Sequence, residues 1–423
     1  MDFELTPKSD ITNYGSYDPD VTSLPAPGNF IPSQIATAYK IPDSNGAGVK
    51  VGILSLGGGF LQSDLNKSMS DLGLSSPTIR QVLLNDATGT FTGNPDSPDV
   101  ENTLDIFCVA GMVPAANITI YIGNVTTPQS WRDIYNRAIS DGCDVITQSW
   151  SAAGVYGDFL SAPLANAAAQ GISVFNSTGD SGSKNHLPTP TEGPNYPATN
   201  ANVIAVGGTI LTVNTSNVRT SEIAATPSGG GISANISLPA YQSGKTYQTY
   251  NSATHITGPA TPLIRRGIPD ISAPFQSYAF YFNGAVLSGI GGTSAATPIM
   301  AGMMARFISL NGGRRPPPNS LSKIFYSNSN SFYDITVGNN ALGLPKGIPD
   351  GYLATAGWDP VTGLGSQANG VQTYQNVTSA GVKVKTNSGW TPVKNISVKT
   401  DSGWANVQHI WVKTGATTWS QTY

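Results

Sequence analysis

The sequence predicts an α/β fold in which a mainly parallel sheet carries helices on both faces, followed by a small C-terminal β-hairpin repeat module. Short apolar runs predict buried strands at residues 51–56, 118–122, 145–150, 172–175 and 203–206. Apolar residues at helical spacing and alanine-rich segments predict helices at residues 130–140, 161–169 and 294–310. Strands that alternate with helices favour a parallel sheet covered on both faces, with functional groups at the carboxyl ends of its strands.

Local signals support individual elements of this fold. The run at residues 51–56 is closed by Gly57-Gly58-Gly59, as expected for a buried strand that enters a loop. In residues 130–140 the large apolar side chains fall on one helical face. Residues 161–169 are followed by Gly171, a normal stop signal for a helix.

The composition limits the kinds of partner. The chain has 423 residues, of which 39% are hydrophobic and 11% charged, with 47 Gly and 30 Pro. This pattern favours a secreted (extracellular) or virion-associated protein over a typical cytosolic enzyme. No segment approaches the roughly 18 consecutive apolar residues of a membrane helix. The net charge is −3 and no long basic run occurs, so we expect no nucleic-acid partner.

The chain has two cysteines, Cys108 and Cys143, and each lies beside an apolar segment. Two buried thiols are the simpler interpretation, while a disulfide stays open. The spacing is not that of a metal site.

The end of the chain contains a short internal repeat. Val-Lys-Thr segments centred on Lys385, Lys399 and Lys413 are spaced 14 residues apart, and each precedes a tryptophan. Alternating apolar residues and Asn-Ser-Gly or Asp-Ser-Gly turns predict β-hairpins. We therefore divide the chain into an extended N-terminal arm (1–30), a main domain (31–375) and a C-terminal repeat module (376–423).

Ser294 lies in the run Gly291-Gly292-Thr293-Ser294-Ala295-Ala296-Thr297-Pro298, at the start of a predicted helix. A serine at this place is usually only a helix N-cap. The glycines, however, let another backbone approach closely, and the segment Gly-Thr-Ser-Ala-x-x-Pro resembles the nucleophile segment of the subtilisin clan. The resemblance implies that Ser294 is the nucleophile of a peptidase with a subtilisin-like fold.

A serine nucleophile needs a general base. In subtilisins that base is a histidine in a His-Gly-Thr-His segment. The chain has three histidines, none of which lies in such a segment: His186, His255 and His409. A Ser-His-Asp triad is therefore disfavoured, which leaves either an inactive protein or a different base.

Glu101 and Asp105 are the candidates for that base. They lie four residues apart in a segment whose apolar residues recur at helical spacing, so they share one helix face. If the two carboxyls share a buried site, one pKa should rise and leave a proton to shuttle. The alternative is a solvated acidic helix start, where Asp99 and Glu101 simply favour the helix dipole.

Asp180 is the third candidate. It lies in the segment Asn176-Ser177-Thr178-Gly179-Asp180-Ser181-Gly182, which follows a predicted strand and so lies at its carboxyl end. An aspartate before Ser-Gly usually forms a turn. In subtilisins the corresponding loop carries an asparagine that donates a hydrogen bond to the oxyanion.

Together these segments resemble the sedolisin family of serine-carboxyl peptidases, which includes kumamolisin-like and tripeptidyl-peptidase enzymes. The resemblance spans roughly residues 31–370. The segments that carry it, in the family's order, are residues 32–39, 57–59, the pair Glu101 and Asp105, residues 179–182 and residues 292–295.

The resemblance assigns a role to each candidate. It implies that Ser294 attacks the scissile carbonyl, that Glu101 takes its proton as general base, and that Asp105 orients Glu101 and shares that proton. Asp180 would donate to the oxyanion together with the Ser294 backbone amide. An aspartate donates only when it is protonated, so the resemblance predicts an acidic optimum.

The resemblance also implies one structural Ca²⁺ ion. Its two halves match residues 332–336 and 356–360. The implied ligands are the side chains of Asp334 and Asp359 and the carbonyl oxygens of Ile335, Thr355 and Gly357. Calcium favours such oxygen ligands. Without the resemblance, an Asp-Pro turn would be the ordinary interpretation of Asp359.

One position departs from the family's pattern. The family's first strand often ends in Glu-Leu-Gly-Gly-Gly, where the glutamate extends the chain of hydrogen-bonded carboxyls. Here Ser55 stands in its place, so we expect the outer link to be shortened to a hydroxyl and the pH profile to shift. Trp150 matches the tryptophan that supports this chain of carboxyls.

The leading hypothesis is an acid-acting serine endopeptidase with polypeptide substrates. We rank it above a tripeptidyl-peptidase because nothing in the sequence identifies a blocked subsite that binds an amine. The alternative is a virion- or surface-attached binding protein on a peptidase scaffold, since the terminal repeats resemble those that end some phage structural proteins. Such repeats would dock to a particle, a surface or carbohydrate. A carboxylate-pair glycosidase would leave Ser294 unexplained.

Overall fold

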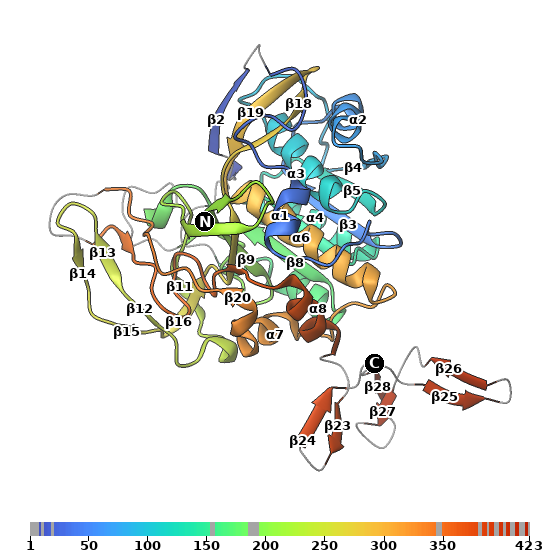
Figure 1. Cartoon of the computed structure of the whole chain (residues 1–423), viewed down its shortest axis with the longest axis vertical. Coiled ribbons are helices and arrows are strands. Elements are labelled where there is room, and N and C mark those ends of the chain that lie inside the picture. Colours follow the sequence, from blue (N-terminus) through green and yellow to red (C-terminus); the bar gives the residue numbers. More distant parts are fainter. Residues whose placement is uncertain are drawn as a thin grey trace.

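The structure is a computed structural model. It describes residues 8–9, 12–17, 21–152, 157–184, 194–343 and 349–379, and six short strands between residues 383 and 421 (Figure 1).

The central sheet follows the predicted α/β pattern. Its ten strands are β3 (Lys50–Ser55), β4 (Arg80–Leu84), β5 (Asn117–Gly123), β6 (Val145–Gln148), β8 (Ser173–Ser177), β9 (Ile204–Val213), β10 (Arg219–Ala224), β17 (Ile271–Pro274), β20 (Phe332–Tyr333) and β22 (Ser366–Gln367). Their order is β20-β22-β17-β9-β8-β6-β3-β5-β4, with β10 beside β9. All neighbouring pairs are parallel except β10 with β9 and β20 with β22. The carboxyl ends of the parallel strands therefore meet at one edge.

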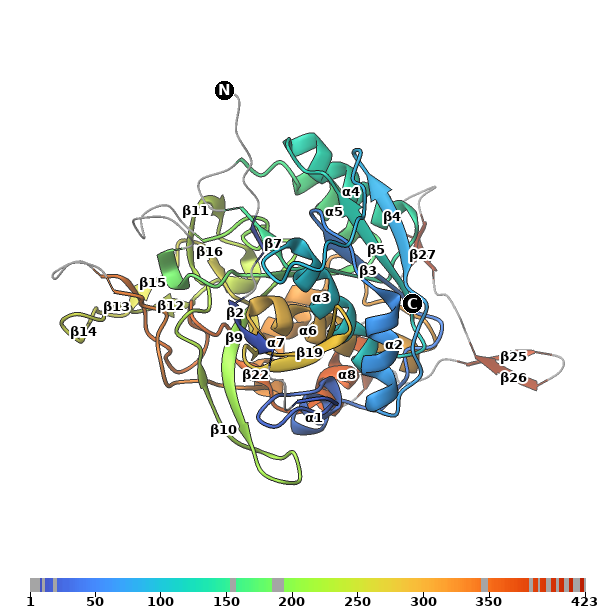
Figure 2. The same ribbon diagram turned by 90° about the horizontal axis from the view of Figure 1, so that it is seen from above.

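Eight helices belong to the described residues: α1 (Pro32–Ala38), α2 (Gln62–Asp71), α3 (Pro98–Met112), α4 (Pro128–Ser140), α5 (Ser161–Ala169), α6 (Thr293–Leu310), α7 (Leu321–Ser327) and α8 (Gly370–Ser379). Two hydrophobic clusters divide them between the faces of the sheet (Figure 2). Ile53 of β3 packs in the cluster of α3 and α6, whereas the adjacent Leu54 packs in that of α4 and α5. Since neighbouring side chains of a strand point to opposite faces, helices cover both faces as predicted.

The structure changes one predicted strand in a way that matters for the site. Residues 145–150 form two strands, β6 and the short β7 (Trp150–Ser151), with Ser149 between them. The break lies at the carboxyl edge of the sheet, where β6 runs between β3 and β8.

Several short strands lie outside the central sheet. A hairpin of β18 (Tyr278–Phe282) and β19 (Ala285–Gly291) pairs with β2 (Thr12–Tyr17), and β1 (Lys8–Ser9) pairs with β7. Further strands pair as β11 (Gly231–Ser237) with β16 (Arg265–Ile268), β12 (Thr246–Tyr247) with β15 (Thr261–Pro262), and β13 (Thr249–Asn251) with β14 (Ile256–Thr257) and β21 (Gly351–Tyr352). The described parts of the N-terminal arm thus pair with strands that adjoin Ser149 and the Ser294 segment.

The C-terminal strands pair as antiparallel hairpins. They are β23 (Lys383–Thr386) with β24 (Gly389–Pro392), β25 (Ser397–Thr400) with β26 (Gly403–Asn406), and β27 (Trp411–Lys413) with β28 (Trp419–Gln421). In each hairpin the repeated lysine stands opposite the tryptophan. That these hairpins form a separate module stays a prediction.

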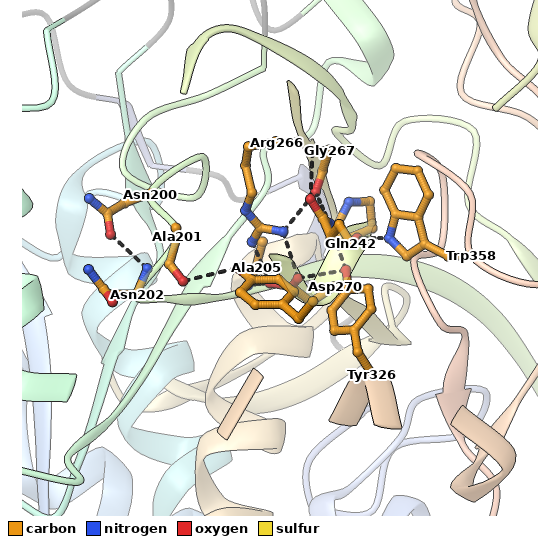
Figure 3. A network of polar contacts seen from close by, with 12 residues as sticks. Asn200, Ala201, Asn202, Ala205, Gln242, Arg266, Gly267, Asp270, Tyr326 and Trp358 are labelled. Carbon is orange, nitrogen blue, oxygen red and sulfur yellow. Dashed lines mark hydrogen bonds and ion pairs between the residues drawn. The ribbon is translucent and has the colours of Figure 1, made fainter. Parts of the chain in front are cut away.

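A buried ion pair joins the sheet to the β11–β16 region (Figure 3). Two Arg266 nitrogens lie 2.7 and 2.6 Å from the two carboxylate oxygens of Asp270. The Ala205 backbone N–H and the Tyr326 hydroxyl also donate to Asp270. Burial alone would lower the pKa of Arg266, but the adjacent carboxylate raises it above the usual value. Three segments of the chain therefore meet at one charged pair.

The two thiols agree with the simpler prediction. Cys108 and Cys143 are free and buried, and they belong to the clusters on opposite faces of the sheet. Among the described residues, no helix is long and apolar enough to cross a membrane.

Candidate active site

Ser294 is the second residue of α6, and its local backbone explains the preceding glycines. Gly292 occupies the N-cap with a φ of 121°, a conformation that favours glycine. A Cβ atom on Gly291 would lie 2.3 Å from the Phe275 carbonyl oxygen. The N-cap interpretation of Ser294 is therefore wrong, because Gly292 fills that position and the Ser294 hydroxyl is available for another contact.

That contact is with Glu101. The Ser294 Oγ donates a hydrogen bond to Glu101 Oε2 over 3.1 Å. Glu101 lies in the first turn of α3, which packs directly against α6. Both side chains are fully buried. A carboxylate within hydrogen-bond reach of a serine hydroxyl can accept its proton.

Asp105 lies one turn further along α3 and is also buried. Burial raises the pKa of Asp105 well above its usual range, and a hydrogen bond from Ser149 lowers it in part. The Ser149 Oγ lies 2.8 Å from Asp105 Oδ1. Because Glu101 and Asp105 are both out of water, the alternative of a solvated acidic helix start is wrong for this pair.

Asp99 has a structural role that the sequence pattern did not reveal. Ser97 caps α3, and the buried Asp99 side chain turns away to bind two loops. Its Oδ1 accepts from the Gly59 N–H, and its Oδ2 accepts from Thr92 and Gly93. Asp99 therefore fixes the loops beside the first turn of α3, where Glu101 lies.

The expected outer link through Ser55 is wrong. The Ser55 hydroxyl lies within hydrogen-bond distance of Asn102 Oδ1 and of the Gly57 carbonyl, and no bond to Glu101 or Asp105 is found. Asn102 in turn donates to the Gly57 and Gly59 carbonyls. The Ser55 hydroxyl therefore contacts the glycine loop and the Asn102 side chain that binds this loop.

Trp150 is buried, and its role as a support for the carboxyls stays a prediction. Within the part of the chain that the structure describes, its indole nitrogen has no hydrogen-bond partner. The Trp150 backbone carbonyl accepts a hydrogen bond from the Asn176 side chain.

Asp180 lies at the N-terminal end of α6. Its Oδ1 accepts from both the backbone N–H and the hydroxyl of Thr293, each over 2.8 Å. The Gly179 N–H donates to the same hydroxyl over 3.1 Å. Thr293 therefore holds Asp180 next to Ser294, and sequence reasoning gave Thr293 no role because this contact joins residues far apart in the chain.

The five expected calcium ligands lie in two segments that meet. The Gly357 N–H donates to Asp334 Oδ2 over 2.8 Å, and the Thr355 N–H donates to Asp359 Oδ2 over 3.0 Å. The Ile335 carbonyl lies near the Thr362 hydroxyl, which also reaches Asp359. Burial raises the pKa of Asp359 to about 7, although several backbone N–H groups lower it.

His255, the histidine within the described residues, lies on a hairpin outside this site. Its ring bonds to the Tyr250 hydroxyl on the exposed β13–β14 hairpin. His186 and His409 lie outside the described residues.

The fold and the site together define an α/β protein of subtilisin-like fold with a serine–carboxyl site. A family model described as "Subtilase family" matches residues 85–329. The chain belongs to the subtilase family and, within it, to the sedolisin family.

Individual relatives agree with this assignment. Kumamolisin of Bacillus sp. (strain MN-32) is 31% identical over 363 residues, which cover 81% of this chain and 62% of kumamolisin. Tripeptidyl-peptidase sed1 of Aspergillus fumigatus is 34% identical over 228 residues, which cover 47% of this chain and 34% of that protein. The structure of Pseudomonas sedolisin, a serine-carboxyl proteinase complexed with pseudo-iodotyrostatin, aligns with a TM-score of 0.66 and 26% identity, covering 84% of this chain and 98% of sedolisin. The chain spans less than two thirds of the length of the curated relatives it matches.

Proposed function

We propose that this protein is a serine-carboxyl endopeptidase that hydrolyses peptide bonds in acid. The observation that carries the proposal is the 3.1 Å hydrogen bond from the Ser294 hydroxyl to the buried Glu101 carboxylate. It supplies a nucleophile and a base in one contact, without a histidine.

In the proposed first step, Ser294 Oγ attacks the scissile carbonyl carbon while its proton passes to Glu101 Oε2. Collapse of the tetrahedral intermediate breaks the C–N bond, and Glu101 returns the proton to the leaving amine. Water then attacks the acyl-enzyme, and the same carboxyl takes and returns its proton. Asp105 keeps a proton next to Glu101, which is consistent with the raised pKa of the buried Asp105 carboxyl.

Asp180 and the Ser294 backbone N–H form the proposed oxyanion site. The first N–H groups of a helix have no partner within the helix and can point to an anion. Asp180 Oδ1 already accepts two hydrogen bonds from Thr293. The acidic proton that Asp180 donates therefore belongs on Oδ2. Because a carboxyl donates only when protonated, the proposed site works in acid and fails as Asp180 ionises.

We also propose one structural Ca²⁺ ion at Asp334 and Asp359, with the carbonyls of Ile335, Thr355 and Gly357. The donor set fits, since two carboxylates and three carbonyl oxygens are the hard ligands that calcium prefers. The hydrogen bond from the Gly357 N–H to Asp334 already joins the two segments, and the Thr355 N–H donates to Asp359 within one of them. A bound ion would neutralise Asp359, whose burial otherwise disfavours its charge.

The proposal extends to location and substrate. We propose that the enzyme is extracellular and that it cleaves internal peptide bonds of denatured polypeptides. We assign the hairpins between residues 383 and 421 no part in hydrolysis. Docking of those hairpins to a particle, a surface or carbohydrate stays a prediction.

Mass spectrometry of the digest of an unfolded protein at acidic pH tests the reaction class. An endopeptidase releases overlapping internal fragments, whereas a tripeptidyl-peptidase releases tripeptides from one end. Purified Ser294→Ala protein is the matched control. If this variant still produces fragments, the proposed function is wrong.

A further inference from the structure

Ser149 lies at the break between β6 and β7 and is fully buried. It stands at the carboxyl edge of the sheet, and its hydroxyl meets groups from both α3 and α6. Its Oγ lies 2.8 Å from Asp105 Oδ1 and 3.2 Å from the Ser294 carbonyl oxygen. One hydroxyl therefore touches both halves of the proposed catalytic machinery.

Pro298 explains why the Ser294 carbonyl can use this hydroxyl. In an α-helix the carbonyl of one residue accepts from the N–H four positions later. For Ser294 that position is Pro298, which has no N–H. The Ser294 carbonyl thus lacks its normal helical donor, and Ser149 is the side chain that reaches it.

The two oxygens of Asp105 are not equivalent. Oδ1 accepts from Ser149, whereas Oδ2 is buried and has no partner in the described part of the chain. A hydroxyl has one hydrogen to donate, and the shorter contact is to Asp105. A proton held by Asp105 therefore belongs on Oδ2.

We propose that Ser149 is a positioning residue, which fixes the Asp105 carboxyl so that its proton stays on Oδ2. The inference rests on the proposed function, because it assigns a task within the same site. Ser149 touches no reacting atom, so its effect passes through Asp105.

The charged and titratable groups around Asp105 are few. On α3 they are Glu101 and Cys108, and the pKa of Cys108 is raised by burial and then by the charges of Asp105 and Glu101. On β18, the buried Tyr278 donates its hydroxyl hydrogen to the Pro274 carbonyl. On α6, Arg306 bonds to the Met112 carbonyl at the far end of α3. The adjoining segments β6 and β7 contribute no ionisable side chain, and the one on β3 is the exposed Lys50 at the amino end of that strand, away from the carboxyl edge.

The first test compares Ser149→Ala with Thr147→Val. Thr147 is a buried residue of the adjoining strand β6 whose hydroxyl has no partner among the described residues, so its replacement removes a nearby hydroxyl and breaks no bond. We expect Ser149→Ala to lower kcat roughly 2- to 10-fold, the range for a lost hydrogen bond to a neutral, protonated carboxyl. KM should stay near its normal value, because Ser149 is buried. In an Asp180→Asn background, where ionisation of Asp180 no longer ends activity, the alkaline limb of kcat should move to higher pH, because ionised Asp105 has lost its donor.

The second test needs no activity. In a Ser294→Ala background, which prevents self-digestion, thermal unfolding is followed with and without Ser149→Ala as pH is varied. The folded pKa of Asp105 lies above its unfolded value, so stability falls as pH rises from the unfolded value toward the folded one. Ser149→Ala raises the folded pKa further, and its destabilisation should therefore grow with pH. Thr147→Val should show no such trend.

These outcomes separate the two hypotheses. If hydrolysis survives Ser294→Ala, the proposed function fails, whatever Ser149 does in the unfolding experiment. If hydrolysis depends on Ser294 but Ser149→Ala keeps the normal kcat and pH profile, only the role of Ser149 is overturned. A destabilisation by Ser149→Ala that is equal at every pH would also overturn it, since that is the result of lost packing alone.

Discussion

Ser294 Oγ and Glu101 Oε2 lie 3.1 Å apart, although 193 positions separate them in the sequence. Direct packing of α3 against α6 brings them together. Both side chains are out of water, so a proton that moves between them travels within the protein. The direct serine–carboxyl contact makes a histidine unnecessary at this site.

Asp180 provides the first prediction. Removing one oxyanion donor costs about 10²–10³-fold in kcat, so Asp180→Ala should slow turnover by that amount. Asp180→Asn should lose less and keep activity to higher pH, because an amide N–H donates at any pH. Steady-state kinetics between acid and neutral pH measures both, and equal losses for the two variants would contradict the donor role.

Thr293 provides the second prediction. Thr293→Val keeps the shape of the side chain but removes the hydroxyl that donates to Asp180 Oδ1. We expect kcat to fall about tenfold with little change in KM, the loss of roughly one good hydrogen bond. The control is Thr297→Val, one turn further along α6, whose hydroxyl bonds only to the Thr293 carbonyl. A similar loss of kcat in both variants would argue against a special role for Thr293.

Calcium removal provides the third prediction. A ligand at about 100 times its Kd stabilises the folded state by about 2.7 kcal/mol. A chelator should therefore lower the Tm by several degrees, and added Ca²⁺ should restore it. Asp334→Asn should abolish this response, because one of the two carboxylates is lost. Differential scanning calorimetry of the unmodified protein and of Asp334→Asn is the measurement. If the Tm of the unmodified protein does not change with chelator or added Ca²⁺, the proposed calcium site is wrong.

The buried ion pair provides the fourth prediction. Asp270→Ala leaves the Arg266 charge buried without its carboxylate, which should lower the free energy of unfolding by about 3–5 kcal/mol. Arg80→Ala breaks a bond to Asp141 at a half-exposed side chain and should cost less than about 1 kcal/mol. Denaturant unfolding of both variants in a Ser294→Ala background gives the comparison, and equal costs would show that Arg266 is not held as described.

Much of the fold could be predicted from the sequence, because long apolar runs and helical spacing depend on local pattern. The helices at residues 130–140 and 161–169 and the strands near them follow that rule. Strands such as β12 or β21 could not be found, since two-residue strands carry no periodic signal. The break at Ser149 was missed because an apolar run does not reveal where a strand turns.

The site was only partly predictable for a related reason. Glu101 and Asp105 are four residues apart on one helix, so their position on one helix face could be predicted from the sequence. Ser55 was misassigned because its partner depends on where Asn102 points, which only the packed loop decides. Thr293 and Ser149 act through contacts between distant segments, and a single sequence contains no sign of those contacts.

The most direct test of the central claim is a pH–rate profile of peptide hydrolysis for the unmodified protein, Glu101→Gln and Ser294→Ala. The account predicts a maximum in acid for the unmodified protein and a loss of activity in both variants at every pH. Gln cannot accept the serine proton as a carboxylate does, although it keeps the size of Glu101. Hydrolysis by Glu101→Gln at the rate of the unmodified protein, or a maximum at neutral pH, would contradict the assignment of Glu101 as the base for Ser294.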